Sequence, residues 1–320
     1  MDISIIVCTH NRAKTLKETL LSFSQLKWHK GTSYELLVVD NNSGDNTKAV
    51  VAKFARENPN IRYVVEDKVG LSHARNRGIL ETQGNIAAFV DDDIAFDECW
   101  GQAILQAFKD YELASCVGGK NIPVFLEGSP EWKIDDVAGF YGDTRFGETP
   151  KFIEFPEYPF GLNMACKREV FSKVGLFSID LGRYGGSLLS GEEAEFFYRV
   201  NMAGLKVFYT PHAVIHHRIP AERTKARWIL RRFFYQGVSD VIFEQMKGRQ
   251  SRQELFRSAL KNFSYAKRYI VGDFLYSPRK LRWHLKKIKP EGWADILYKI
   301  GRMRQELADA VLPNRKSIKI

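Results

Sequence analysis

The sequence predicts an α/β fold in which a mostly parallel sheet, covered by helices on both faces, is followed by a C-terminal helical extension. Three observations support this prediction. The first 120 residues alternate short continuous apolar runs with segments of helical periodicity, a pattern typical of parallel strands buried on both faces. Polar residues directly follow several of these runs. From about residue 222 only helical patterns remain.

The N-terminal strands are predicted from apolar runs of strand length, each ended by polar or turn-forming residues. Between them, apolar residues recur at helical spacing. The predicted strands are Ile3–Cys8, Leu36–Val39, Ile61–Val65 and Ile86–Val90, and the intervening helices are marked by Leu16, Leu20 and Phe23 and by Val50, Val51 and Phe54.

The middle of the chain, residues 120–190, is less regular and rich in Gly, Pro and aromatic residues. Loops of this kind often carry function in α/β enzymes. We predict one more strand at Gly161–Cys166, a helix that opens at Gly191, and extended segments at 206–209 and 213–215.

The C-terminal segment differs from the rest of the chain in charge. Residues 1–221 contain 24 basic and 29 acidic residues, a net charge of −5, whereas residues 222–320 contain 24 basic and nine acidic residues, a net charge of +15. Such a division favours an anionic partner for the basic segment. Apolar residues recur there in two helical stripes: Leu255, Ala259, Phe263, Ala266, Ile270 and Phe274, and Trp293, Ile296, Ile300, Met303 and Leu307.

The composition, 44% hydrophobic and 27% charged over 320 residues, is that of a globular protein and excludes collagen-like and disordered classes. No apolar run approaches the roughly 18 residues of a membrane span, and the N-terminus lacks the basic start of a signal peptide. We therefore expect a cytoplasmic protein. The four cysteines lie far apart without CxxC spacing, which indicates reduced thiols rather than a zinc site or disulfide framework.

Three adjacent carboxylates, Asp91, Asp92 and Asp93, follow the fourth predicted strand. A divalent cation relieves the repulsion between such groups, and carboxylate oxygens suit Mg²⁺ or Mn²⁺. The alternative is a solvated loop whose Asp residues cap the helix near Asp97. Their place after a strand favours the site, because ligands of open α/β sheets bind beyond the carboxyl ends of the strands.

Two further residues each have a structural and a functional interpretation. Asp40 precedes the turn-rich segment 41–45, where a role in the turn alone is sufficient to explain it. Arg75 lies in a helical segment, Gly70–Gly78. Its guanidinium can bind phosphates through two hydrogen bonds, although a surface salt bridge is the more common role.

Four segments, in order and at plausible spacing, together resemble family 2 glycosyltransferases of the GT-A fold: Ile5–Arg12, Val38–Ser43, Gly70–Gly78 and Phe89–Asp93. The segment Gly191–Glu195 is similar to the acidic acceptor-site motif of that family. The resemblance covers roughly residues 1–218. It implies a GT-A catalytic domain at 1–221, with a nucleotide-sugar half at 1–120 and an acceptor half at 121–221, and leaves 222–320 as a basic helical extension.

The family resemblance implies an inverting hexosyl transfer from a nucleotide-diphosphate sugar to a glycan or lipid-linked acceptor, as in bacterial polysaccharide and cell-surface glycan synthesis. By the same resemblance, Asp40 would bind the nucleotide base and Arg75 the base or a phosphate. A Mn²⁺ or Mg²⁺ ion would bridge the two phosphates and stabilise the leaving group. The implied donor-binding residues are Thr9, Asn11, Arg12, Asp40, Arg75, Asp91 and Asp92, and the implied metal ligands are Asp93, Asp91 and His217.

An inverting displacement needs a base for the acceptor hydroxyl. The family motif is commonly Glu-Asp with the Asp as base, and this chain has Glu192-Glu193. Glu193 occupies the base position, with Glu192 as the alternative. The alternative is that both carboxylates only stabilise the N-terminus of the helix through the helix dipole. The glycines of 182–191 suggest an acceptor lid at Gly182–Ser190.

His216 and His217 end the last predicted strand, where a structural role is the more common one for histidine. In the family a late histidine completes the metal site or contacts the diphosphate, and His217 is the candidate here. His216 is expected on the opposite face of the strand because neighbouring side chains alternate.

Two other classes compete with this assignment. A sugar-phosphate nucleotidyltransferase usually has a Gly-rich loop after its first strand, and here that strand leads into Thr9–Arg12 without a glycine. A nucleic-acid-binding protein would use the basic segment but would leave Asp93 and Glu193 unexplained, so no nucleic acid is expected. Basic amphipathic helices suit an anionic membrane surface, which predicts peripheral binding at the inner face of the cell membrane through 222–320. The alternative is that the helical stripes pack on the catalytic domain.

Overall fold

The computed structural model describes residues 1–128, 130, 134–248, 250–271 and 290–311. The chain forms two compact units. The first, here called the sheet unit, comprises Met1–Glu127, Ala138–Ile179 and Glu192–Pro220. The second, here called the helical unit, comprises Gly128–Val137, Asp180–Gly191 and Ala221–Ile320. The segment 180–191 thus groups with the C-terminal helices, whereas the sequence analysis placed it in the acceptor half.

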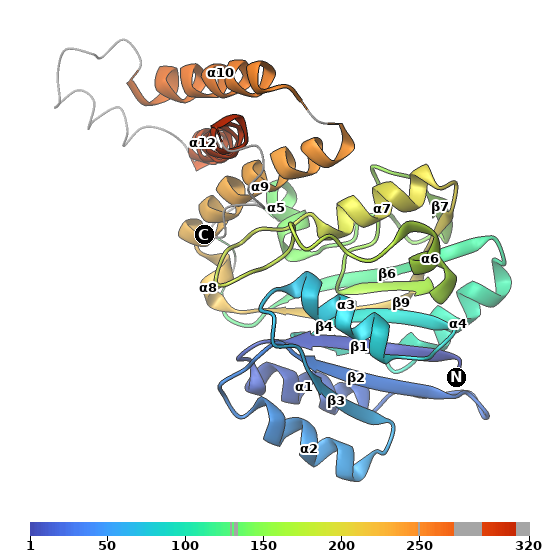
Figure 1. Ribbon diagram of the computed structural model, residues 1–320. Coiled ribbons are helices and arrows are strands. Elements are labelled where there is room, and N and C mark those ends of the chain that lie inside the picture. Colours follow the sequence, from blue (N-terminus) through green and yellow to red (C-terminus); the bar gives the residue numbers. More distant parts are fainter. Residues whose placement is uncertain (129, 131–133, 249, 272–289, 312–320) are drawn as a thin grey trace. The chain divides into compact units, whose positions relative to one another are not determined.

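A nine-stranded sheet forms the centre of the sheet unit (Figure 1), and its order is β3-β2-β1-β4-β8-β6-β9-β5, with β7 paired to β9. The strands from β3 to β4 are mutually parallel. β8 runs antiparallel to both of its neighbours, and β6 and β9 are parallel. The predicted α/β fold with a mostly parallel sheet and C-terminal helices is confirmed. The strands are β1 (Ile3–Thr9), β2 (Tyr34–Asp40), β3 (Ile61–Val65), β4 (Ile86–Asp91), β5 (Ile94–Phe96), β6 (Ala114–Phe125), β7 (Lys151–Ile153), β8 (Asn163–Lys167) and β9 (Lys206–Ile219).

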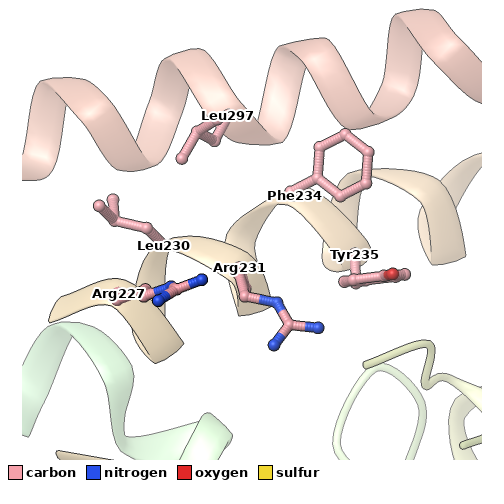
Figure 2. Close-up of a pocket in the computed structure, with 6 residues that line it drawn as sticks. All are labelled: Arg227, Leu230, Arg231, Phe234, Tyr235 and Leu297. Carbon is pink, nitrogen blue, oxygen red and sulfur yellow. The ribbon is translucent and has the colours of Figure 1, made fainter. Parts of the chain in front are cut away.

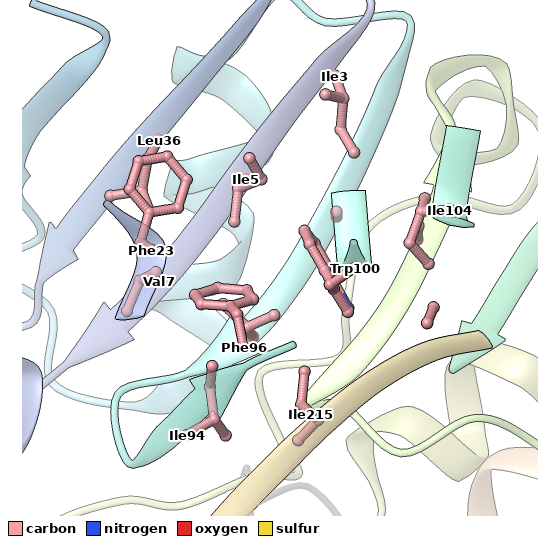
Figure 3. Close-up of a cluster of buried hydrophobic side chains, with 14 of the residues drawn as sticks. Ile3, Ile5, Val7, Phe23, Leu36, Ile94, Phe96, Trp100, Ile104 and Ile215 are labelled. Carbon is pink, nitrogen blue, oxygen red and sulfur yellow. The ribbon is translucent and has the colours of Figure 1, made fainter. Parts of the chain in front are cut away.

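Helices cover both faces of this sheet, which explains why the strands are continuously apolar. On β1, Ile5 belongs to one buried cluster and Ile6 to the other, because successive side chains of a strand point to opposite faces. Figure 3 shows Ile5 and its neighbours packed with Phe23 and Trp100. The first cluster includes α1 (Ala13–Phe23), α2 (Thr47–Glu57) and α4 (Trp100–Asp110), and the second includes α3 (Leu71–Glu81), α6 (Arg168–Val174) and α7 (Glu192–Met202).

The register of the sheet brings the polar strand ends together. Thr9 pairs with Asp40 across β1 and β2, and Cys8 pairs with Asp91 across β1 and β4. Because these strands are parallel, their carboxyl ends meet at one edge of the sheet.

The last strand of the sheet is longer than predicted. The two extended segments expected at 206–209 and 213–215 are parts of one strand, β9, of 14 residues. Its pairing with β6 contains register shifts between Ala114 and Cys116 and between Gly118 and Lys120. These irregularities absorb the extra residues and let β9 continue to His217.

In the helical unit, α12 (Pro290–Val311) packs against both α9 (Ala226–Lys247) and α10 (Arg252–Val271). The backbones of α9 and α12 approach closely at two glycines. A Cβ on Gly237 would overlap the backbone at Tyr298, and a Cβ on Gly301 would overlap the backbone at Phe234. The short elements α8 (Ala221–Thr224) and α5 (Ile134–Val137) belong to this unit, whereas a 3-10 turn at Ala138–Tyr141 belongs to the sheet unit.

The two apolar stripes predicted for the extension are partly buried within the helical unit. Leu255, Ala259 and Ala266 of α10 are buried, as is Ile296 of α12. Phe263, predicted in the same stripe, is instead 51% exposed. The side chain of Ile270 and all of Phe274 lie outside the described residues. None of the described helices is long and apolar enough to span a membrane.

Candidate active site

The carboxylates after β4 lie in a dense polar network. Arg12 donates from Nη1 to Asp92 Oδ1 at 2.6 Å and from Nη2 to Asp93 Oδ2 at 2.7 Å. The Thr9 hydroxyl donates to Asp92 Oδ2 at 2.6 Å. Asp92 and Asp93 are buried, whereas Asp91 retains substantial side-chain exposure. The two residues expected at the end of β1, Thr9 and Arg12, are therefore brought to the Asp cluster.

The protonation of Asp92 reflects this crowding. Burial raises the pKa of Asp92 to about 6, against the opposing charge of Arg12, and the neighbouring Asp93 carboxylate adds to the increase. Burial and a neighbouring carboxylate both disfavour the ionised form of a carboxyl group. An additional positive charge at the cluster would favour the ionised form.

His217 approaches the cluster from β9. Its Nδ1 lies 2.6 Å from the backbone carbonyl oxygen of Tyr141, so Nδ1 carries a proton that it donates to this oxygen. The other ring nitrogen, Nε2, lies 3.4 Å from Asp93 Oδ1. His217 is buried and His216 is more exposed, as the alternation along a strand predicts.

These residues fit a divalent cation in part. Asp93 Oδ1 and His217 Nε2 are an oxygen and a nitrogen donor atom at close range, and Asp91 lies at the same strand end. Among the described residues, however, no group of three or more His, Cys, Asp or Glu side chains is arranged to hold a metal ion. Mg²⁺ is commonly held by one or two carboxylates together with substrate phosphates, so an incomplete protein ligand set is compatible with this chemistry.

Arg75 on α3 is surrounded by carboxylates. Its Nη1 donates to Glu192 Oε1 at 2.9 Å, and its Nη2 lies 3.5 Å from Glu193 Oε1 and 3.8 Å from Asp91 Oδ1. The guanidinium is buried. Arg75 therefore connects the start of α7 to the end of β4. The base or phosphate contact that the resemblance implied for Arg75 stays a prediction.

The two glutamates that open α7 differ in their surroundings. The side chain of Glu192 is 3% exposed and that of Glu193 is 20% exposed. Both follow Gly191, whose φ of +95° allows the sharp entry into the helix. Glu193 is the one of the two whose carboxylate stays partly exposed.

Asp40 is held in the turn that follows β2. Its Oδ1 accepts from the Ser43 N–H at 2.9 Å, and its Oδ2 accepts from the Tyr63 hydroxyl at 2.6 Å. Asn11 reaches the same turn, where its Oδ1 accepts from the Gly44 N–H at 2.7 Å. These bonds agree with the turn interpretation of Asp40, and its contact with a nucleotide base stays a prediction.

Sequence reasoning did not find the contacts through which three residues shape the site: Tyr141, Tyr63 and Gly161. Tyr141 acts through its backbone carbonyl, which leaves no signal in the sequence. Tyr63 lies on β3, and its hydroxyl contacts Asp40 of the neighbouring strand β2. This contact becomes recognisable only when the pairing of the two strands is known. A Cβ on Gly161 would overlap Arg75 Nη2 and Glu193 Oε1, so the absence of a side chain there makes room for both.

The predicted lid is held within the helical unit. Arg232 of α9 donates from Nη1 to the Leu188 carbonyl at 2.6 Å and lies 3.2 Å from Ser190 Oγ. The Ser190 N–H donates to Ser239 Oγ at 3.1 Å. This segment leads directly along the chain into Glu192.

The fold and the cluster of carboxylates at its strand ends define a GT-A glycosyltransferase. Residues 4–175 match the family model described as glycosyl transferase family 2. The chain belongs to this family and is a glycosyltransferase enzyme, as the sequence motifs predicted.

Two relatives are similar over most of the chain. One is the glucosyl-dolichyl phosphate glucuronosyltransferase of Haloferax volcanii, 26% identical over 249 residues, which are 76% of this chain and 78% of the relative. The other is the succinoglycan biosynthesis protein ExoM of Rhizobium meliloti, 26% identical over 245 residues, which are 74% and 73% of the two chains.

Solved structures show the same fold. The mannosyltransferase PcManGT from Pyrobaculum calidifontis, in complex with GDP-Man and Mn²⁺, aligns with a TM-score of 0.62 and 18% identity over 98% of this chain and 88% of its own. TarS of S. aureus in complex with UDP-GlcNAc aligns with a TM-score of 0.56 and 15% identity over 96% and 91% of the two chains.

Proposed function

We propose that this glycosyltransferase inverts the anomeric centre by a single displacement, with Glu193 as the base. The observation that supports this role is the contrast at the start of α7. Glu192 is buried against Arg75, whereas Glu193 is partly exposed and only 3.5 Å from the same guanidinium. A base must reach the acceptor hydroxyl to take its proton, and Glu193 has the accessible carboxylate.

In this mechanism Arg75 orients the base. Its guanidinium holds Glu192 and lies beside Glu193 and Asp91, so it links the acceptor side of the reaction to the donor side. The Glu193 carboxylate accepts the proton of the acceptor hydroxyl while the oxygen attacks the anomeric carbon, and the nucleoside diphosphate leaves from the opposite face.

The donor would bind beyond the ends of β1, β2 and β4. Asp93, His217 and Asp91 are the residues that would hold a Mn²⁺ or Mg²⁺ ion. Such an ion supplies Lewis-acid stabilisation of the diphosphate leaving group. The other donor-binding residues proposed are Thr9, Asn11, Arg12, Asp40 and Asp92. PcManGT was solved with GDP-Man and Mn²⁺, which supports this class of donor and cofactor.

We further propose a glycan or lipid-linked acceptor in polysaccharide or cell-surface glycan synthesis. The names of the two relatives, one a glucosyl-dolichyl phosphate glucuronosyltransferase and the other a succinoglycan biosynthesis protein, support this class. The enzyme would act in the cytoplasm, at the inner face of the membrane, without a nucleic-acid partner.

An exposed apolar stripe on α10 supports peripheral membrane binding. Phe256, Leu260 and Phe263 are 50%, 51% and 51% exposed, and their spacing places them on one face of the helix. Exposed cations flank them on the same helix, including Arg257 and Lys261. Apolar side chains bordered by cations are typical of helices that lie on anionic membranes.

The function is tested by incubating the protein with a panel of nucleotide sugars and Mn²⁺. Metal-dependent release of a nucleoside diphosphate identifies the donor. NMR of the product, formed with an acceptor that accelerates this release, gives the anomeric configuration. A product that retains the donor configuration would contradict the single displacement, and the absence of release with every donor would contradict the proposed donor class.

A further inference from the structure

The helical unit contains a groove that the proposed chemistry does not use. Its volume is about 590 Å³, and it lies along α9 and α12. Figure 2 shows Leu230 and Phe234 on the side of α9 that faces Leu297 of α12, and the guanidinium of Arg231 on the opposite side. Because Arg227 and Arg231 also line it, the groove has a cationic edge beside its apolar wall. It is lined by Arg227, Leu230, Arg231, Phe234, Tyr235 and Leu297.

The cationic edge consists of two arginines one helical turn apart. Arg227 and Arg231 are both exposed, and their i, i+4 spacing places them on the same face of α9. In the part of the chain that the structure describes, no ion pair joins either guanidinium to a carboxylate. Arg231 Nη2 lies 3.5 Å from the Gly186 carbonyl oxygen, which leaves its other N–H groups available to a ligand.

The stretch of chain that supplies the α9 residues of the groove is positively charged. Residues 223–239 contain five cations and no acidic residue. Such a segment attracts an anion. The five cations are Arg223, Lys225, Arg227, Arg231 and Arg232.

We propose that this groove binds a phosphate ester that carries an apolar chain, with the phosphate on Arg227 and Arg231 and the chain along Leu230, Phe234 and Leu297. Guanidinium groups bind phosphate oxygens through paired, charge-assisted hydrogen bonds. The apolar wall contributes favourable binding free energy only when the ligand buries hydrocarbon against it. A volume of about 590 Å³ is within the usual range for small-molecule sites.

This inference rests on the proposed function for the source of the ligand, which is the phosphate of a lipid-linked acceptor. The groove also has a link along the chain to the proposed base. Gly186, which Arg231 contacts, belongs to the segment 180–191, and that segment continues directly into Glu192 and Glu193. Occupation of the groove would thus act on the segment that precedes the base.

The probe for this site is octyl phosphate, titrated into the full chain by calorimetry below its critical micelle concentration. The double variant Arg227→Gln/Arg231→Gln is compared with Lys53→Gln/Arg56→Gln, which removes the same charge from exposed positions on α2. We expect the first pair to weaken binding at least about tenfold, since hydrogen bonds to charged groups are lost. The control pair should bind as wild type does.

Two further ligands test the apolar wall. Inorganic phosphate and octanol should each bind more weakly than octyl phosphate, and Leu297→Asn should weaken octyl phosphate binding without affecting inorganic phosphate. The proposal would be overturned if the two charge variants lost the same octyl phosphate affinity, or if the wild type did not bind octyl phosphate. It would also be overturned if inorganic phosphate or octanol bound as tightly as octyl phosphate. Donor turnover by the wild type is measured in parallel. If the wild type binds octyl phosphate but turns over no donor, the result contradicts the proposed function and not the proposed groove ligand.

Discussion

Arg75 Nη1 donates to Glu192 Oε1 across 2.9 Å, and both side chains are only 3% exposed. This buried ion pair fixes the first turn of α7 against α3. Removing one partner of such a pair leaves an uncompensated buried charge. Glu192 therefore contributes to the structure of the site, and the adjacent Glu193 is left as the accessible carboxylate.

Glu193→Gln should lower turnover by at least about 10²-fold, the usual effect of losing a general base. The amide keeps the shape of the side chain but cannot accept the proton. Donor affinity and melting temperature should change little because Glu193 is partly exposed. Steady-state kinetics and a thermal melt provide the measurement.

The matched variant is Glu192→Gln. It removes one charge from a buried pair, and breaking such a pair costs on the order of 3–5 kcal/mol, so we expect a clear fall in melting temperature. An active Glu193→Gln enzyme beside an inactive, fully stable Glu192→Gln enzyme would show that the two roles are exchanged.

Asp93→Asn should abolish Mn²⁺-dependent donor binding. Asp93 Oδ1 faces His217 Nε2 at 3.4 Å, and the amide removes the charge that a divalent cation requires. Binding is followed by calorimetry with and without Mn²⁺, and the fold by circular dichroism. Wild-type turnover by the variant with excess chelator would contradict the metal assignment.

Gly161→Ala should impair catalysis by displacing Arg75 and Glu193, since the added Cβ would overlap both side chains. We expect turnover to fall by at least about tenfold, on the scale of losses caused by misplacing catalytic groups by about an ångström. Gly139→Ala is the control, because a Cβ there meets no atom within 4 Å. Unchanged turnover in Gly161→Ala would show that the site adjusts to the extra atom.

Gly301→Ala should destabilise the helical unit. The new Cβ would overlap the backbone of α9 at Phe234, and overpacking of this kind costs about 1–3 kcal/mol. The comparison is Gly248→Ala at the end of α9, where nothing lies within 4 Å of the added Cβ. Denaturant unfolding of both variants measures the difference, and equal stabilities would refute the close approach of α9 and α12.

Replacing Phe256, Leu260 and Phe263 together with Ser should reduce co-sedimentation of the full chain with anionic vesicles. The three side chains are half exposed and would insert into the interface. The control replaces Leu80, Leu113 and Ile179, which are exposed apolar residues of the sheet unit. Equal pelleting of the two triple variants, or equal pelleting on neutral and anionic vesicles, would exclude the α10 face as an electrostatically assisted membrane contact.

Local patterns were sufficient for the framework of the protein. The strands from β1 to β4 and the helices between them follow from apolar runs and helical spacing, because burial on both faces of a parallel sheet dictates those patterns. The carboxylate run at Asp91–Asp93 was recognisable for the same reason, since it directly follows a buried strand.

The tertiary structure decided what depends on contacts between distant segments. Which of Glu192 and Glu193 stays exposed depends on how α7 is rotated toward Arg75, and the space for both depends on Gly161. His217 is oriented by a backbone carbonyl at Tyr141, and Phe263 is exposed although its neighbours in the predicted stripe, Ala259 and Ala266, are buried. The sequence by itself determined the elements and the polar residues at their ends, because these are set by near neighbours along the chain. Packing decided which of these residues are buried, oriented or accessible, because that depends on partners brought together only by folding.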